Sequence, residues 1–206
     1  FMHILSLLGN APNYDNTVKN GTYSAGTLFT DVSRSFYEIR GKRIGIVGMG
    51  AIGTGVARVA EAFGMEVVYY STSGTGHCKE WPSISLEELM RTSDVISIHA
   101  PYNERTAGLI GEAELAMMKP TAIIVNMGRG GIVDEEALAQ AIDNDSIGGA
   151  ALDVFARETL PGGSPLLRTR DPEKWRFRPH TAWASVEART RLINCIADNI
   201  RTEMGL

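Results

Sequence analysis

Three residues in this chain have side chains that could together hold a carboxylate and transfer a proton. Arg129 lies between glycines directly after an apolar run, where a guanidinium can hold a carboxylate through two hydrogen bonds. His180 follows Pro179, whose ring fixes the entry of the chain, and Glu158 lies in a loop before it. An imidazole titrates near neutral pH, so it suits proton transfer, and a carboxylate such as Glu158 would stabilise its charged form.

These residues also have simpler interpretations. Arg129 could do no more than tie its loop to the helix predicted to start near Asp134. Asp153 ends an apolar run and could cap a turn, and Glu158 could be a solvated surface acid. The residue types alone leave these alternatives open.

The chain has four histidines, so the choice of an acid–base imidazole is narrow. His3 falls in a predicted helix and His77 in a predicted surface loop. His99 ends a predicted strand and is the rival of His180, although packing is the simpler explanation of its position.

A glycine triplet in the first third of the chain predicts a site for a diphosphate. The apolar run Arg43–Val47 leads into Gly48-x-Gly50-x-x-Gly53, and a helical pattern follows over 54–63. Gly48 allows a tight strand-to-helix turn, Gly50 lacks the Cβ that would block a pyrophosphate, and Gly53 lets the helix pack close. The N-terminus of that helix would attract the anion. The alternative is a glycine-rich turn that only tightens strand–helix packing.

The elements that must position these residues alternate between strand and helix. Strands are predicted at Arg43–Val47, Glu66–Tyr70, 95–99, 121–126 and 148–152, and helices at 51–63, 86–91, 110–118 and 134–142. Most of the strands are near-continuous apolar runs, as is typical of strands buried on both faces. The alternation predicts an α/β fold with a doubly wound parallel sheet of the Rossmann type. Ligands on such sheets bind beyond the carboxyl ends of the strands, where all the clusters above fall.

The two ends of the chain are predicted to be helical. A hinge helix is expected at about 1–9 and a returning amphipathic helix at about 185–204, with a polar connector at 13–35 and a long loop at 155–179. The apolar spacing of the last helix predicts five buried positions: Val186, Leu192, Ile193, Ile196 and Ile200.

Composition excludes several classes of protein. A chain of 206 residues supports one sizeable core, and a net charge of −4 argues against nucleic-acid binding. No apolar run approaches membrane-spanning length. Cys78 and Cys195 are far apart and have no nearby ligand partners, so we expect no metal site, reduced thiols and a cytoplasmic location. Because the chain starts at Phe1, we expect a fragment or the ordered part of something longer.

The motifs and their order resemble the D-isomer-specific 2-hydroxyacid dehydrogenase family. The resemblance runs from about Ile39 to the last helix and rests on the glycine fingerprint, the stretch 126–134, the stretch 151–155 with Glu158, and the stretch 179–183. The final His-x-Ala-Trp is similar to that of glycerate dehydrogenase and hydroxypyruvate reductase members. The family also has a second, substrate-facing domain, which this resemblance implies is absent from 1–206, leaving the dinucleotide-binding domain.

The resemblance implies a hydride-transfer enzyme. It assigns Arg129, Glu158 and His180 as the catalytic set, with no metal, and places Asp153 against the nicotinamide carboxamide. The expected substrate is a small D-2-hydroxy or 2-keto acid of the glycerate, hydroxypyruvate, glyoxylate or lactate kind. The expected cofactor contacts are Gly48, Gly50, Ala51, Ile52, Gly53, Ser71, Thr72, Ser73, His99, Ala100, Pro101, Met127, Gly128, Asp153 and Ala182.

Two other functions fit the same fold. One is a nicotinamide-sensing module in which chemistry is incidental, and the other is a Rossmann enzyme that does not use the three catalytic residues. Relatives commonly form homodimers through the cofactor domain, and we expect a homodimer with the connector 13–35 reaching the partner. No nucleic acid or membrane partner is expected.

Two departures from the family pattern bear on this reading. Ser71 stands where NAD-preferring relatives have an acidic residue for the ribose 2′-OH. The absence of that carboxylate removes a group that would repel a 2′-phosphate, so NADP is expected to be accepted as well as NAD. The alternative is that NAD still binds, with a hydroxyl in place of the acid. No arginine lies beside Ser71 in the sequence, and Lys79 is the nearest fixed positive charge. Thr159 replaces the usual proline after Glu158, which would loosen that loop.

Overall fold

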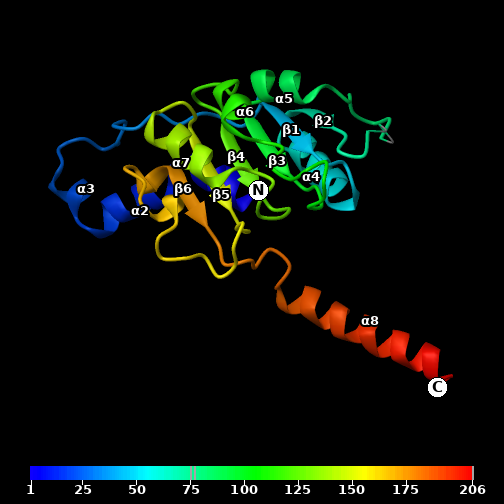
Figure 1. Cartoon of the computed structure of the whole chain (residues 1–206). Coiled ribbons are helices and arrows are strands. Elements are labelled where there is room, and N and C mark those ends of the chain that lie inside the picture. The colour runs from blue at the N-terminus through cyan, green and yellow to red at the C-terminus, as the bar shows by residue number, and fades with distance from the viewer. Residues whose placement is uncertain (75, 77, 206) are drawn as a thin grey trace.

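A six-stranded parallel sheet forms the centre of the computed structural model (Figure 1), which describes residues 1–74, 76 and 78–205. The strands lie in the order β2-β1-β3-β4-β5-β6, and each neighbouring pair is parallel. Their bounds are β1 Arg43–Val47, β2 Glu66–Tyr70, β3 Val95–Ile98, β4 Ile123–Asn126, β5 Gly149–Leu152 and β6 Trp175–Phe177. The predicted α/β doubly wound fold is therefore confirmed, and the strand order reverses between β1 and β3, the point at which such sheets bind ligands.

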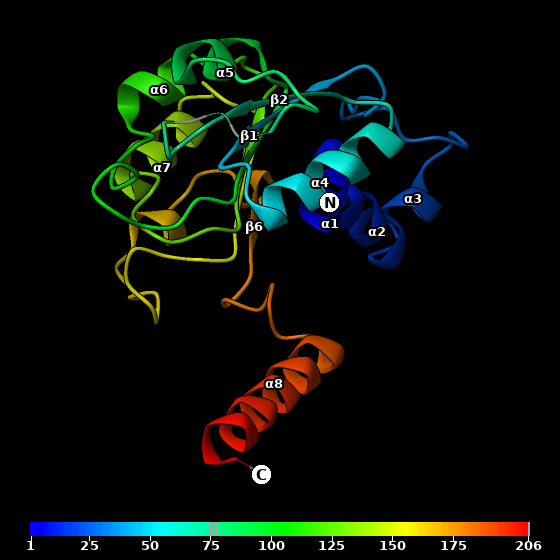
Figure 2. The same ribbon diagram turned by 90° about the vertical axis from the view of Figure 1, so that its right-hand side faces the viewer.

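Helices cover both faces of this sheet (Figure 2). The helices of the whole chain have the bounds α1 Met2–Leu8, α2 Ala11–Lys19, α3 Thr22–Ala25, α4 Ala51–Ala62, α5 Leu86–Thr92, α6 Glu112–Ala116, α7 Glu135–Asp143 and α8 Val186–Met204, and those that cover the sheet are α1 and α4 on one face and α5, α6 and α7 on the other. The apolar residues of α1 and α4 join one buried cluster, and those of α5, α6 and α7 join a second cluster on the opposite face. The strands between the two clusters are buried on both sides, which explains why they are continuous apolar runs.

Local signals explain where several elements begin and end. Ser85 caps α5, because its hydroxyl accepts the N–H of Glu88 at 3.1 Å, and Asp134 caps α7 in the same way through the N–H of Ala137. The helix predicted at 110–118 is shorter, since Ile110 instead forms a bridge with Val133.

Two predicted irregular segments contain regular structure. The connector 13–35 includes most of α2 and all of α3, and the loop 155–179 includes β6. The strand β6 has only three residues with mixed polarity, so it lacks the apolar run that identified the other strands. Trp175 is nevertheless buried and stacks on Phe177 with ring centroids 5.2 Å apart, which anchors the sheet edge. His77 lies outside the described residues.

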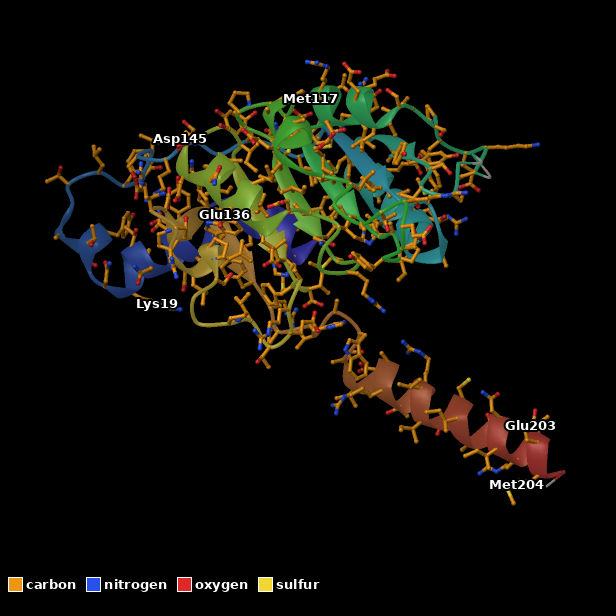
Figure 3. The ribbon with its side chains drawn as sticks, viewed as in Figure 1. Lys19, Met117, Glu136, Asp145, Glu203 and Met204 are labelled. Carbon is orange, nitrogen blue, oxygen red and sulfur yellow. The ribbon has the colours of Figure 1, made fainter. Side chains whose placement is uncertain are left out.

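The expectation that α8 is buried is wrong. Its five predicted core positions, Val186, Leu192, Ile193, Ile196 and Ile200, are between 46% and 66% exposed. The helix leaves the domain and extends away from it, so that Glu203 and Met204 lie far from the sheet (Figure 3). The amphipathic pattern correctly predicted a helix, but a pattern does not identify the surface that covers its apolar side. Within the part of the chain that the structure describes, every helix is too short or too polar to cross a membrane.

Candidate active site

The predicted functional residues lie along one edge of the sheet, where the strands reach their carboxyl ends. Neighbouring loops follow the strand order: Ser71 comes after β2, Gly48 after β1, His99 after β3, Arg129 after β4 and Glu158 after β5, with His180 following β6. Strands are about 4.8 Å apart, so this edge spreads the glycine loop and the acid–base residues over several strand spacings. An extended ligand could therefore reach both groups.

The glycine loop after β1 has the geometry of a diphosphate site. Gly48 has φ of 94°, a conformation that favours glycine. A Cβ on Gly53 would lie 2.3 Å from the carbonyl oxygen of Gly48, whereas a Cβ on Gly50 would meet nothing within 4 Å. Gly53 is thus required by packing, and Gly50 leaves open space at the start of α4, where no side chain caps the helix. These features fit a pyrophosphate that accepts the N–H groups of the first turn.

A cavity of about 830 Å³ opens beside this loop. The predicted cofactor contacts that line it are Gly48, Gly50, Ser71, Thr72, Ser73, His99 and Pro101. Ala51, Ile52, Gly53, Ala100, Met127, Gly128, Asp153 and Ala182 are not among its lining residues. The cavity therefore joins the loops after β1, β2 and β3, and the acid–base residues lie outside it along the same edge.

One lining residue corrects the expectation that the nearest positive charge to Ser71 is Lys79. Arg105, in the loop after β3, lines this cavity and donates from Nη1 to the carbonyl of Ser73 at 2.7 Å. Lys79 is not among the lining residues. Nothing in the sequence pairs Arg105 with Ser71, because Arg105 lies several residues beyond the end of β3 and β1 separates β2 from β3 in the sheet.

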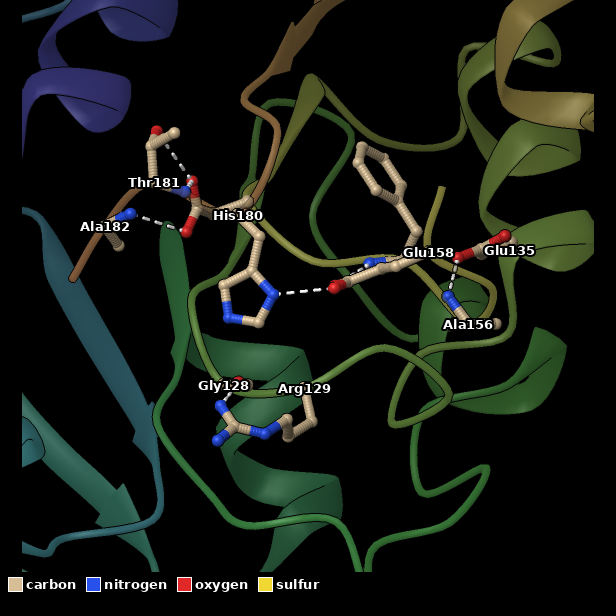
Figure 4. A network of polar contacts seen from close by, with 10 residues as sticks. Gly128, Arg129, Glu135, Ala156, Glu158, His180, Thr181 and Ala182 are labelled. Carbon is tan, nitrogen blue, oxygen red and sulfur yellow. Dashed lines mark hydrogen bonds and ion pairs between the residues drawn. The ribbon is translucent and has the colours of Figure 1, made fainter. Parts of the chain in front are cut away.

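The acid–base pair expected from the sequence is formed directly (Figure 4). Nδ1 of His180 lies 2.7 Å from Oε2 of Glu158, despite Thr159 in the following position, and the two side chains are 36% and 39% exposed. The hydrogen bond from His180 lowers the pKa of Glu158, and the N–H of Phe155 and the charge of Arg129 act in the same direction. Because an ionised carboxylate only accepts hydrogen bonds, Nδ1 carries a proton and Nε2 is the nitrogen that can exchange one.

The backbone of His180 is held by Asp153. His180 has φ of 52°, an uncommon conformation that costs about 1 kcal/mol or more outside glycine. The buried carboxylate of Asp153 accepts the N–H of Thr181 at 2.9 Å and that of Ala182 at 2.8 Å, and its carbonyl accepts the N–H of His180 at 2.8 Å. Asp153 therefore fixes the turn that presents the imidazole, which agrees with the simpler interpretation of this residue.

Arg129 is brought to the same site by a close backbone contact. A Cβ on Gly130 would lie 1.8 Å from the carbonyl oxygen of Phe155, so only glycine permits the loops after β4 and β5 to touch. The side chain of Asn126 braces this loop by donating to the carbonyl of Arg129 at 2.9 Å. Among the described residues, the guanidinium bonds to the carbonyl of Gly128 at 2.8 Å and not to α7, which disagrees with the interpretation that it ties the loop to that helix.

His99 has a different environment. Its Nε2 lies 2.8 Å from the hydroxyl of Ser97, and its Nδ1 is buried with no hydrogen-bond partner among the described residues. Burial lowers the pKa of His99 to about 4. A neutral imidazole across physiological pH is a poor proton exchanger, which favours His180 over its rival.

The buried imidazole of His99 predicts how stability depends on pH. Its folded pKa of about 4 lies below the ordinary value of 6.5, so the unfolded chain binds more protons between these values, and stability falls as the pH is lowered through this window. Between pH 7.5 and pH 5 the free energy of unfolding should therefore fall by about 2 kcal/mol less in His99→Gln than in the wild-type protein. Urea unfolding at the two pH values measures this change, and equal losses in both proteins would contradict it.

The fold and the glycine loop define a dinucleotide-binding α/β domain, and a hydrogen-bonded histidine–carboxylate pair lies along the same edge. The chain belongs to the D-isomer specific 2-hydroxyacid dehydrogenase family, because the model of that family's NAD binding domain matches residues 1–182. It is 45% identical over 166 residues to the glyoxylate reductase of Aeropyrum pernix, covering 79% of this chain and 49% of that protein. It is 37% identical over 187 residues to the glycerate dehydrogenase of Methylorubrum extorquens, covering 91% and 58%.

A solved structure shares the fold of this chain. An acyclic imino acid reductase in complex with NADPH and D-Arg superposes with a TM-score of 0.85 at 31% identity, covering 98% of this chain and 62% of that one. The chain spans about half the length of the glyoxylate reductase that it matches.

Proposed function

We propose that this chain is the cofactor-binding domain of an NAD(P)-dependent D-2-hydroxyacid dehydrogenase. The observation that carries the proposal is the hydrogen bond between Glu158 and His180, held in place by Asp153 at the edge that also presents the glycine loop. A structural ion pair needs no strained histidine on a turn fixed by a buried carboxylate. The glyoxylate reductase and glycerate dehydrogenase relatives support the same reaction class.

The cofactor would be held by the loops after β1, β2 and β3. The first turn of α4 and Gly50 would receive the pyrophosphate, and Ser71 and its neighbours would face the adenosine ribose. A bound nicotinamide cofactor would supply or accept the hydride. We propose NAD as one cofactor and NADP as another, because no carboxylate stands at position 71 to exclude a 2′-phosphate.

Three side chains would carry out the catalytic steps that this chain contributes. Arg129 would hold the substrate carboxylate and polarise the adjoining carbonyl. Nε2 of His180 would give a proton to the substrate oxygen in reduction and take it back in oxidation. Glu158 stays ionised through its lowered pKa, so it keeps Nδ1 protonated and orients the ring.

We further propose that residues 1–206 act with a substrate-facing domain, between the hinge helix α1 and the returning helix α8. The exposed apolar positions of α8 support this arrangement, because such a face requires a partner. A homodimer is proposed through the segment that contains α2 and α3, where Leu28 and Phe29 are 70% and 90% exposed. The proposed location is the cytoplasm.

A substrate screen tests the proposed function. The full-length protein is assayed for oxidation of NADH and NADPH with glyoxylate, hydroxypyruvate and pyruvate, and we expect turnover with at least one pair. Tight nucleotide binding without turnover of any 2-keto acid would favour the nicotinamide-sensing module instead. Equilibrium binding of each nucleotide is measured alongside, so that the two outcomes are separated.

A further inference from the structure

Two loops that are distant in the sequence meet at the cavity beside the glycine loop. Arg105, after β3, donates to the carbonyl of Ser73, after β2, at 2.7 Å. The strand β1, which leads into the glycine loop, lies between β2 and β3 in the sheet, so this contact joins two loops whose strands are not neighbours. The guanidinium, Ser71, Thr72 and Ser73 all line the same cavity as Gly50.

The backbone around Arg105 is fixed by a local hydrogen-bond network. The hydroxyl of Thr106 donates to the carbonyl of Pro101 at 2.6 Å and accepts the N–H of Asn103 at 2.9 Å, and Thr106 is fully buried. The side chain of Asn103 accepts the N–H of Arg105 at 2.9 Å. The arginine therefore projects from a braced turn, which reduces the ordering that a ligand would have to impose.

The chemistry of this corner matches a phosphate monoester. Residues 71–73 all carry hydroxyl groups. NAD-preferring relatives have a carboxylate at the end of β2, which would repel a 2′-phosphate, and this chain has none there. A guanidinium has five N–H donors in a planar fork that fits phosphate oxygens in pairs. Glu104 lines the cavity as well and opposes this charge, so the net attraction depends on Arg105.

We propose that Arg105 is the specificity-determining residue for a 2′-phosphate on the adenosine ribose, and that it acts together with the hydroxyls at 71–73. This inference rests on the proposed function only in requiring that a nicotinamide dinucleotide binds along this edge. It assigns cofactor choice to a residue on the loop after β3, whereas the acidic residue of NAD-preferring relatives lies at the end of β2.

The test compares equilibrium binding of NADPH, NADH, adenosine 2′,5′-bisphosphate and adenosine 5′-monophosphate to the full-length protein by titration calorimetry. Arg105→Ala is expected to weaken NADPH and the 2′,5′-bisphosphate by about 10- to 100-fold, and to leave NADH and the 5′-monophosphate within about twofold. Ser71→Asp should weaken NADPH and strengthen NADH. Arg91→Ala is the matched control, because it removes an arginine that pairs with Glu87 on α5, and it should change neither affinity.

Each alternative outcome has a distinct meaning. Equal weakening of NADPH and NADH by Arg105→Ala would make Arg105 a support for the loop and overturn the inference. Unchanged NADPH affinity, or a wild-type protein that binds NADH but not NADPH, would also overturn it while leaving the proposed function intact. Failure of the wild-type protein to bind either dinucleotide would contradict the proposed function itself.

Discussion

Replacing His180 is expected to lower kcat on a 2-keto acid by about 10²- to 10⁴-fold, because the substrate oxygen loses its proton donor. Nucleotide affinity should stay within about twofold, since His180 does not line the cavity beside the glycine loop. His180→Asn is a better variant than His180→Ala, because asparagine tolerates the positive φ of 52° at this position and alanine would be strained by it. Steady-state kinetics and nucleotide titration on the full-length protein measure both effects.

Two comparisons make the His180 result specific. Glu158→Gln should cause a smaller loss of kcat and keep the fold, because glutamine can still accept from Nδ1 but carries no charge to stabilise the protonated ring. His99→Gln should leave the neutral part of the pH profile of kcat unchanged, since the pKa of His99 is about 4. Near-normal turnover by His180→Asn, or a loss confined to His99→Gln, would transfer the proton-exchange role to His99.

Five of the six strands could be predicted because each has a recognisable sequence pattern. The strands from β1 to β5 are short apolar runs ended by turn residues, and burial on both faces selects for that pattern. The strand β6 was missed because its three residues carry a mixed pattern, and only pairing with β5 makes them a strand. The exposure of α8 could not be predicted, because an amphipathic pattern shows that a helix has an apolar side but not whether a surface covers that side.

The site residues with a local sequence signal could be predicted, whereas the contacts between distant segments could not. Arg129, Glu158 and His180 stand out because each follows a strand end and has a reactive side chain. The residue type of Asp153 predicted that it could cap a turn, but not that the turn is the one carrying His180, because a carboxylate does not show which backbone N–H groups it will accept. Arg105 was missed because its contact with Ser73 joins residues that neither share a motif nor follow neighbouring strands.

The second and third glycines of the fingerprint, Gly50 and Gly53, are expected to respond in opposite ways to replacement by alanine. Gly53→Ala places a Cβ 2.3 Å from the carbonyl of Gly48, an overpacking that costs about 1–3 kcal/mol and outweighs the helix preference of alanine. The melting temperature should fall by about 3–10 °C for a domain of this size. Thermal unfolding without nucleotide measures this directly.

Gly50→Ala should leave folding intact and weaken dinucleotide binding instead. Gly50 has φ of −87° and ψ of −164°, which any residue adopts, and its Cβ would enter open space. That space is where a pyrophosphate must approach the backbone, so a methyl group there should weaken NADH and NADPH alike by about 10- to 100-fold, or roughly 1.4–2.8 kcal/mol. Equal loss of both nucleotides separates this effect from that of Arg105, which selects between them. If Gly50→Ala instead lowered the melting temperature as much as Gly53→Ala and bound nucleotide normally, the triplet would be a packing device and the dinucleotide would have to bind elsewhere.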